Sequence, residues 1–396
     1  MPCATRGCPG ADRGAGVKYV VCIPDGCADE PVPALDGRTP LEAAHMPTLA
    51  SLAARGTLGR ARVIPEGLPA GSDVGNMSIL GYDPARYHNG RAPIEAAAMG
   101  LRLDAEQVAY RCNLVTVAGD GTMEDFAGGR PSTEAAAEVV GALQAELGGE
   151  VSFHAGVQYR HIVVAPASWA EADCTPPHDL TGQQAVLPTG AAAPRLLALM
   201  EASRDVLARF DVAATQVWFW GQGTSPQMPA FADRYGKAAG LVSAVDLVRG
   251  LGVLTGMEVV TVAGATGWYD TDYEGKRDAA LEALAAGADL FVIHVEASDE
   301  AGHAGDAPEK VRSLENWDRR ILTDLVAGLD DLGPWRLLLL PDHATPLVLR
   351  THTSDPVPYL LVDSQTAGPG GCYTEAAVAG APAAAGHSLM GRLLGR

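Results

Sequence analysis

The segment from Leu290 to His303, LFVIHVEASDEAGH, constrains the fold more than any other part of the chain. Its first half is a hydrophobic, β-branched run of the kind that forms a strand buried inside a sheet. Strand propensity then collapses, so Asp299 and His303 follow the carboxyl end of a predicted core strand, where open α/β sheets place their ligands. A carboxylate and an imidazole four residues apart share one face of a helical turn and can hold a divalent cation. Taken alone, the pair is equally consistent with a capping aspartate followed by a solvated histidine.

Two other segments repeat this pattern. The apolar run RLLLLPDH ends in Asp342 and His343, and the run GVKYVVCIPDG ends in Asp25. His352 follows in the loop RTHTSDPVP, which we expect to fold back over the same edge of the sheet. Such a set of oxygen and nitrogen ligands is large enough for two cations, and it suits Mn²⁺ or Zn²⁺ better than Ca²⁺. The predicted ligands are Asp25, Asp299, His303, Asp342, His343 and His352.

A candidate nucleophile lies in the segment PEGLPAGSDVGNMSILGYDP. Glycine and proline keep its first residues out of a helix, and Ser72 and Asp73 are predicted to form the N-cap of the helix that follows. A serine hydroxyl there lies beside backbone N–H groups and the positive end of the helix dipole, which stabilise an alkoxide or a bound phosphate. Ser72 could also be an N-cap and nothing more. The predicted metal ligands favour the nucleophile, because they need a group to activate.

Composition limits the partners and the compartment. The chain has 48 acidic and 29 basic residues, and its net charge of −19 disfavours nucleic acid and anionic membranes as partners. Seven scattered cysteines predict reduced thiols in a cytoplasm rather than a disulfide framework. Residues 1–16 lack the apolar core of a secretory signal and are predicted to be a disordered extension. No apolar run approaches the roughly 20 residues of a membrane span.

The order of the predicted elements indicates one domain inserted into another. The strands that carry the predicted metal ligands lie on both sides of a middle region with strands and helices of its own. The site can therefore close only if the first segment packs against the last. We expect an α/β fold in which a core sheet flanked by helices, residues 17–104 and 233–396, is interrupted by a smaller α/β domain at residues 105–232.

An anionic substrate would require positive charge to be concentrated locally. Arginine is the natural clamp for carboxylate and phosphate groups, because its guanidinium binds both in a bidentate manner. Arg111 and Arg160 are the strongest candidates, since they lie in predicted strands where an unpaired charge is costly. Each candidate could instead form a surface salt bridge. The other candidates are Arg91, Arg130, Lys276, His161, Asp179 and Asn113, whereas His45, His88, His154, His178 and His387 have no evident partner.

Together the motifs PDGCAD, GSDVGNMSILGYDP, ASDEAGHAGD, PDHATP and HTSDPVP resemble those of the cofactor-independent phosphoglycerate mutases of the archaeal type and their bacterial relatives. The resemblance covers nearly the whole chain after Val17, and its motifs are specific in order and spacing. It implies the fold of the alkaline phosphatase superfamily, with a smaller domain inserted into the core. It also implies one metal ion held by Asp299, His303 and His352 and a second held by Asp25, Ser72, Asp342 and His343.

The resemblance implies interconversion of 3-phosphoglycerate and 2-phosphoglycerate through a phosphoserine at Ser72. Two divalent ions, Mn²⁺ or else Zn²⁺, Co²⁺ or Mg²⁺, would activate the hydroxyl without an organic cofactor. Asn76 stands where the larger bacterial form of the family carries histidine, and the bacterial relatives also carry labels such as phosphonate-pathway enzyme and homoserine kinase. A metal-dependent phosphatase or phosphotransferase acting on another small phosphorylated metabolite is therefore the alternative. A non-catalytic metal-binding protein is a third hypothesis.

Overall fold

The computed structural model describes residues 16–396, which form two compact units. Unit 1 comprises the described part of residues 1–62 together with residues 235–243 and 260–396. Unit 2 comprises residues 63–234 and 244–259. Except for Gly16, the predicted extension at residues 1–16 lies outside the described residues. Residues 63–104, which include Ser72, thus belong to unit 2, whereas the boundaries predicted from the sequence place them in the core domain.

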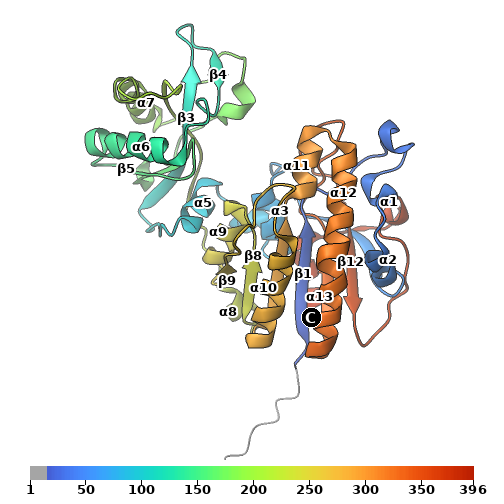
Figure 1. The fold of residues 1–396 in the computed structure, drawn as a ribbon. Helices are drawn as coiled ribbons and strands as arrows, with labels where there is room; N and C mark the ends of the chain where they lie inside the picture. Colours follow the sequence, from blue (N-terminus) through green and yellow to red (C-terminus); the bar gives the residue numbers. More distant parts are fainter. Residues whose placement is uncertain (1–15) are drawn as a thin grey trace, which may run out of the picture. The chain divides into compact units, whose positions relative to one another are not determined.

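The sheet of unit 1 has the strand order β13-β2-β12-β11-β1-β10-β8-β9. Figure 1 labels β8, β1 and β12 of this sheet. Its strands are β1 (Lys18–Pro24), β2 (Thr57–Arg62), β8 (Ala239–Val242), β9 (Glu258–Val260), β10 (Leu290–Val295), β11 (Trp335–Leu339), β12 (Val357–Asp363) and β13 (Ala383–Ala385). The strands β11, β1, β10 and β8 are parallel, whereas β12 is antiparallel to both β11 and β2. Of β9, only Val260 belongs to unit 1.

The central strands are buried along almost their whole length and are mostly apolar. All six residues of β10 are buried, and so are all but the first residue of β1. Strands buried on both faces read as continuous apolar runs, which is why they stand out in the sequence. The helices of unit 1 are α1 (Pro40–Ala43), α2 (Pro47–Ala53), α10 (Tyr273–Ala286), α11 (Ala297–Ala304), α12 (Ala307–Trp317), α13 (Thr323–Leu332), α14 (Glu375–Val378) and α15 (Leu389–Leu393).

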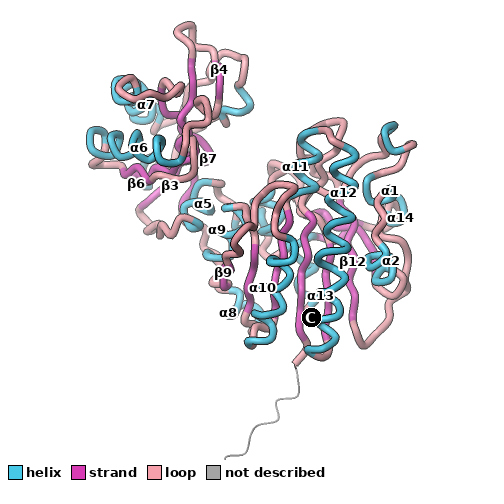
Figure 2. The backbone as a smooth tube through the Cα atoms, viewed as in Figure 1, coloured by secondary structure: helices cyan, strands magenta, loops and turns pink. Residues whose placement is uncertain are grey.

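Unit 2 is built on an antiparallel sheet of five strands, in which β4, β3, β6 and β5 are neighbours in that order and β7 also pairs with β3. These strands are β3 (Gln107–Val117), β4 (Met123–Asp125), β5 (Ser152–His154), β6 (Arg160–Pro166) and β7 (Gln216–Thr224). Two long helices, α6 (Thr133–Leu147) and α7 (Ala193–Leu207), share the core of this sheet (Figure 2). The shorter helices are α3 (Ser72–Ile79), α4 (Pro84–Tyr87), α5 (Ala92–Ala98), α8 (Phe231–Tyr235), whose last residue belongs to unit 1, and α9 (Asp246–Leu254).

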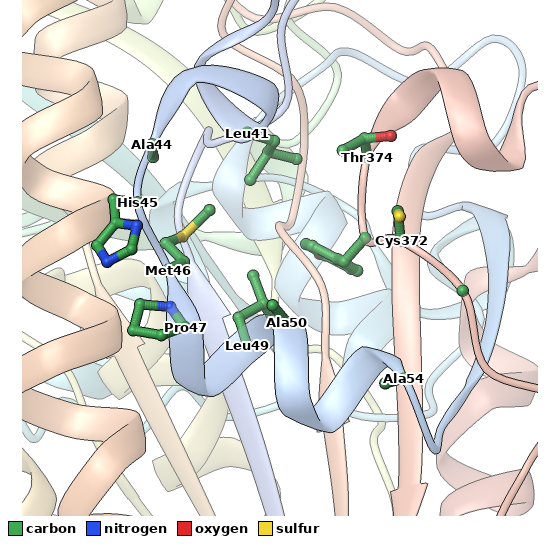
Figure 3. A pocket seen from close by; sticks show the side chains of 12 residues that line it. Leu41, Ala44, His45, Met46, Pro47, Leu49, Ala50, Ala54, Cys372 and Thr374 are labelled. Carbon is green, nitrogen blue, oxygen red and sulfur yellow. The ribbon is translucent and has the colours of Figure 1, made fainter.

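Unit 1 also contains a groove of about 520 Å³ between the turn that joins α1 to α2 and residues 371–374 (Figure 3). Its lining is mainly apolar and includes Leu41, Met46 and Cys372. None of the predicted site residues lines this groove. Among the described helices, none combines the length and the apolar character needed to cross a membrane.

Candidate functional site

The predicted metal ligands of unit 1 gather at one edge of its sheet. Because β11, β1 and β10 are neighbours and run parallel, their carboxyl ends meet at the same edge. Asp25 directly follows β1, Asp299 and His303 lie on α11 just after β10, and the pair Asp342 and His343 follows β11. The strand geometry thus brings together side chains that are about 300 residues apart in sequence.

Asp299, His303 and His352 form the first group of donor atoms. One Asp299 carboxylate oxygen lies 3.2 Å from Nε2 of His303, and the other lies 3.5 Å from Nε2 of His352. The two imidazole Nε2 atoms are 2.9 Å apart. Donor atoms bound to one ion at about 2.0–2.2 Å lie about 2.8–3.6 Å apart, so these spacings fit a shared cation. Nδ1 of His303 lies 3.0 Å from the carbonyl oxygen of Arg350 and donates its hydrogen to it, so Nε2 is the nitrogen that is directed at Asp299 and would bind a cation.

Asp25, Asp342 and His343 form the second group. Nε2 of His343 lies 3.4 Å from Asp25 Oδ1 and 3.6 Å from Asp342 Oδ2. His343 also stacks on His352 and its Nδ1 lies 4.0 Å from Asp299, so distance alone would allow it in either group.

The hydroxyl of Thr345 decides between the two groups for His343. It donates its hydrogen to the Asp299 carboxylate and lies 3.2 Å from Nδ1 of His343. With its own hydrogen committed to Asp299, the hydroxyl can only accept from Nδ1–H of His343. The lone pair of His343 is then on Nε2, which faces Asp25 and Asp342.

Sequence reasoning missed His294, which lies in β10 and is fully buried. Its Nε2 is 3.3 Å from Asp25 Oδ2 and 3.9 Å from Asp342 Oδ2, so the three residues form another group of potential metal ligands. The signal was present, because a histidine inside an otherwise apolar core strand requires a polar partner. The apolar residues on either side of His294 mask this signal in the sequence.

Three carboxylates, those of Asp25, Asp299 and Asp342, lie close together at this edge of the sheet, and they repel one another unless positive charge is bound nearby. Burial, together with the neighbouring Asp342 and Asp299, raises the pKa of Asp25 well above its ordinary value. Burial also opposes ionisation of Asp299, but its hydrogen bonds with His303 and His352 outweigh that effect and hold its pKa well below the ordinary range. Hydrogen bonding to Asp299 raises the pKa of His303 to about 9. Buried carboxylates are costly unless they are paired with charge, and bound cations would supply it.

A buried ion pair joins the loops that carry these ligands. Lys310 Nζ lies 2.7 Å from Asp29 Oδ2 and 2.8 Å from the carbonyl oxygen of Thr345, and both side chains of the pair are fully buried. The Asp29 carboxylate also accepts the backbone N–H of Leu347, at 3.2 Å from each oxygen. The loop after β1 and the loop after β11 are therefore fixed to each other.

Gly26, next to Asp25, could not be replaced by a larger residue in this arrangement. Its φ of 60° lies in the left-handed region, and a Cβ there would collide with the Asp299 carboxylate and the Thr345 hydroxyl. The tight turn after β1 thus allows the carboxylate of Asp299 to approach the backbone closely.

Ser72 is the first residue of α3, and the N-cap is Gly71, whose φ of −161° is extended. The prediction that Ser72 and Asp73 form the N-cap was therefore wrong by one residue. The chain reaches the helix through a glycine that has no side chain to cap it, so Ser72 lies one position further into the first turn. Ser72 belongs to unit 2, whereas the six ligands predicted from the sequence belong to unit 1, so the place of Ser72 beside them stays a prediction.

The first turn of α3 is stabilised by a hydrogen bond that the sequence did not indicate. Asp73 Oδ2 lies 2.8 Å from Nε2 of His88, so our statement that His88 has no evident partner was wrong. Burial opposes ionisation of Asp73, but its bond with His88 and the charge of Arg91 lower its pKa to about 2. Asn76 also contributes, because its amide donates to the carbonyl oxygen of Ser72 at 2.9 Å.

Two of the predicted arginines come together in unit 2. Arg91 Nε and Arg111 Nη1 lie 3.0 and 3.1 Å from the same Glu95 oxygen, so two guanidinium groups share one carboxylate. Arg111 is buried, its guanidinium lies 4.5 Å from the centre of the Trp220 ring, and its Nε has no hydrogen-bond partner within the described chain. Burial, which outweighs Glu95, lowers the pKa of Arg111 to about 10. This surplus of buried positive charge and the open donor suit an anionic group of a ligand.

The remaining candidates are arranged differently. His161 is buried beside this cluster, and burial followed by the charge of Arg111 lowers its pKa to about 4. Arg130 and Arg160 are exposed. Lys276 does not face a ligand site: its ammonium is fully buried, 2.6 Å from Glu296 Oε2 and 3.0 Å from the carbonyl oxygen of His294. We therefore withdraw Lys276 as a substrate ligand, because its charge is already neutralised inside unit 1.

The two other polar candidates of unit 2 also have partners. Asn113 is buried and accepts a hydrogen bond from Trp220 Nε1 at 3.0 Å, while its amide donates to the carbonyl oxygen of Phe126 at 3.2 Å. Asp179 is exposed and lies 3.7 Å from His178. Neither observation assigns them a ligand.

Comparison with known proteins identifies the family. The model of the 2,3-bisphosphoglycerate-independent phosphoglycerate mutases matches residues 53–213. A protein of this name from Methanothrix thermoacetophila is 47% identical over 88% of this chain and 91% of its own length. The chain belongs to this family. A probable mutase of the same kind from Geobacter sulfurreducens is 44% identical over 96% of this chain and 100% of its own length, so the predicted family and the prediction of an enzyme are both confirmed.

Solved structures support the predicted α/β fold. A protein from Pyrococcus horikoshii matches with a TM-score of 0.76 and 26% identity, over 96% of this chain and 97% of that one. The cofactor-independent phosphoglycerate mutase from Thermoplasma acidophilum matches with a TM-score of 0.66 and 24% identity, over 96% of this chain and 99% of that one. The fold class predicted from the sequence is therefore confirmed.

Proposed function

We propose that this protein interconverts 3-phosphoglycerate and 2-phosphoglycerate through a phosphoserine at Ser72, with two divalent cations. The observation that supports this most is the pair of donor groups at one edge of the sheet of unit 1, in a chain that belongs to this mutase family. We further propose the domain roles expected from the sequence, with residues 105–232 as an inserted domain that encloses the substrate.

Two sets of residues would hold the cations. The first is Asp299, His303 and His352, whose donor atoms are 2.9–3.5 Å apart. The second includes Asp25, Asp342 and His343, with Ser72 as the ligand that the resemblance implies. When bound, the cations, which we propose to be Mn²⁺ with Zn²⁺, Co²⁺ or Mg²⁺ as substitutes, would neutralise the phosphoryl group and lower the pKa of the attacking hydroxyl.

Ser72 carries the phosphoryl group in this proposal. Its Oγ attacks the phosphorus of 3-phosphoglycerate and the bond from phosphorus to the glycerate O3 breaks, while the proton that the Ser72 hydroxyl loses is balanced by the proton that O3 gains. Glycerate then turns, its 2-hydroxyl loses its proton as O2 attacks the phosphoserine, and the bond to Ser72 Oγ breaks as that oxygen regains a proton. The N–H groups in the first turn of α3 suit the phosphate, because a helix N-terminus favours anions.

Arg91 and Arg111 are proposed to hold the glycerate through its carboxylate. Their shared contact with Glu95 leaves positive charge in excess, and Trp220 keeps the Arg111 guanidinium in place. A planar guanidinium clamp suits this role, because it fixes the orientation of a carboxylate as well as its position. Arg130, Arg160 and His161 remain candidates for additional contacts with the substrate.

The test is incubation of the Mn²⁺-loaded protein with 3-phosphoglycerate, followed by ³¹P NMR. We expect 2-phosphoglycerate to form without inorganic phosphate, and a Ser72→Ala variant to form none. Release of inorganic phosphate without 2-phosphoglycerate would support the phosphatase alternative instead. Equal activity of Ser72→Ala and the wild type would exclude the phosphoserine route.

A further inference from the structure

His294 is held between two acidic environments inside unit 1. On one side, its Nε2 faces Asp25 and Asp342 at 3.3 and 3.9 Å. On the other side, its Nδ1 lies 3.1 Å from Glu296 Oε1 and 3.2 Å from the hydroxyl of Ser243. The imidazole is fully buried in the strand β10, so its orientation is fixed by the sheet as well as by these polar groups.

The partners of Glu296 determine which nitrogen of His294 carries the hydrogen. Lys276 Nζ lies 2.6 Å from Glu296 Oε2, and the hydroxyl of Ser243 donates to Glu296 Oε1 at 3.1 Å. Glu296 is therefore ionised and can only accept hydrogen bonds. Nδ1 of His294 must be the donor to it, and the lone pair of the neutral ring then lies on Nε2.

Two buried atoms without hydrogen-bond partners border the same space. Over the described residues, Nε2 of His294 and Oδ1 of Asp25 have no hydrogen-bond partner. Buried polar atoms are rarely left unsatisfied, and here both can donate electron pairs. A carboxylate that orients a histidine from behind is the usual arrangement behind a metal-bound imidazole.

We infer that His294, through Nε2, is a fourth ligand from unit 1 of the cation held by Asp25, Asp342 and His343, and that Glu296 with Lys276 and Ser243 positions its ring. Unit 1 then supplies four donors to this cation without the hydroxyl of Ser72. The cation stays bound when Ser72 carries a phosphoryl group or is replaced. This inference rests on the proposed function for what the cation does, whereas the binding of the cation by these four residues does not depend on that function.

The test compares three variants, His294→Gln, Ser72→Ala and His45→Gln, by titrating metal-free protein with Mn²⁺ in a calorimeter. His45 is an exposed histidine of unit 1 outside the donor groups and serves as the matched control. We expect two cations per chain in the wild type, His45→Gln and Ser72→Ala. In His294→Gln we expect the affinity for one cation to fall at least tenfold. Pulsed electron paramagnetic resonance of the Mn²⁺ forms should show one fewer coupled nitrogen in His294→Gln.

A further variant separates a lost ligand from a damaged fold. The double variant Glu296→Gln/Lys276→Met keeps the shape of both side chains and removes the charge that orients His294 without leaving Lys276 as an unpaired buried charge. We expect it to show roughly a 10–100-fold loss in affinity for the same cation. Circular dichroism at 25 °C checks that each variant is folded. Wild-type affinities and unchanged nitrogen coupling in His294→Gln would overturn the inference. A chain that binds two Mn²⁺ ions but forms no 2-phosphoglycerate would overturn the proposed function alone.

Discussion

Replacing Lys310 by methionine should strongly destabilise unit 1. The Lys310 and Asp29 side chains are both fully buried and 2.7 Å apart, and methionine fills a similar volume without the charge. Asp29 would keep the N–H of Leu347 but lose its counter-ion. Removing one partner of a buried pair leaves an uncompensated charge and typically costs about 3–5 kcal/mol. That is a large part of the roughly 5–15 kcal/mol by which a domain is stable.

Urea denaturation followed by tryptophan fluorescence measures this loss. The matched control is Lys237→Met, because Lys237 pairs with Asp289 at 3.4 Å on the partly exposed surface of unit 1. There we expect a change of less than about 1 kcal/mol. The double variant Lys310→Met/Asp29→Asn removes both charges and should recover more than half of the lost stability. A Lys310→Met protein as stable as the control would refute the reasoning that this pair holds the two loops together.

Three further predictions concern pH, substrate and metal. Folding lowers the pKa of His161 from 6.5 to about 4, so the unfolded state takes up a proton at a higher pH than the folded state does. We therefore expect about 3 kcal/mol of the free energy of unfolding that is present above pH 6.5 to be lost by pH 4. Urea midpoints at both pH values measure this, and a His161→Gln variant with the same slope as the wild type would contradict it. Arg111→Lys should raise the KM for 3-phosphoglycerate about tenfold or more and leave the Mn²⁺ affinity unchanged, because lysine cannot form the bidentate contact with a carboxylate. An unchanged KM in steady-state kinetics would argue against the binding of the glycerate carboxylate by Arg111. Thr345→Val should weaken Mn²⁺ binding about 10–100-fold, because the hydroxyl orients both Asp299 and His343, and calorimetry showing wild-type affinity would count against that role.

The sequence allowed the gathering of side chains in unit 1 to be predicted because the signal is local. Each of the three strands is an apolar run that stops at an acidic residue, and parallel neighbouring strands end at the same edge. The strand pattern could not show which of the two donor groups each histidine belongs to. It depends on hydroxyl groups such as that of Thr345, whose partners come from other parts of the chain.

What was missed or misplaced depends on long-range packing. His294 lies inside a strand whose hydrophobicity masked it, and its partners Ser243 and Lys276 come from elements that are distant in sequence. Lys276 was predicted to bind substrate because a lone lysine carries no sign of burial. His88 meets Asp73 across the turn from α3 to α4, a contact without any fixed spacing that could have indicated it.

Because β1 pairs with β10, which lies far from it in the sequence, β1 cannot take its place in the sheet until most of the chain has been synthesised. Tyr19 pairs with Leu290, so about 270 residues must be translated before the first strand meets this neighbour. At about 5–20 residues per second, this apolar strand waits between about 14 and 54 seconds for its place in the sheet. Residues 63–234 of unit 2 emerge during that interval and can fold first. The apolar segment of β1 therefore stays without its strand partners while most of the chain is synthesised.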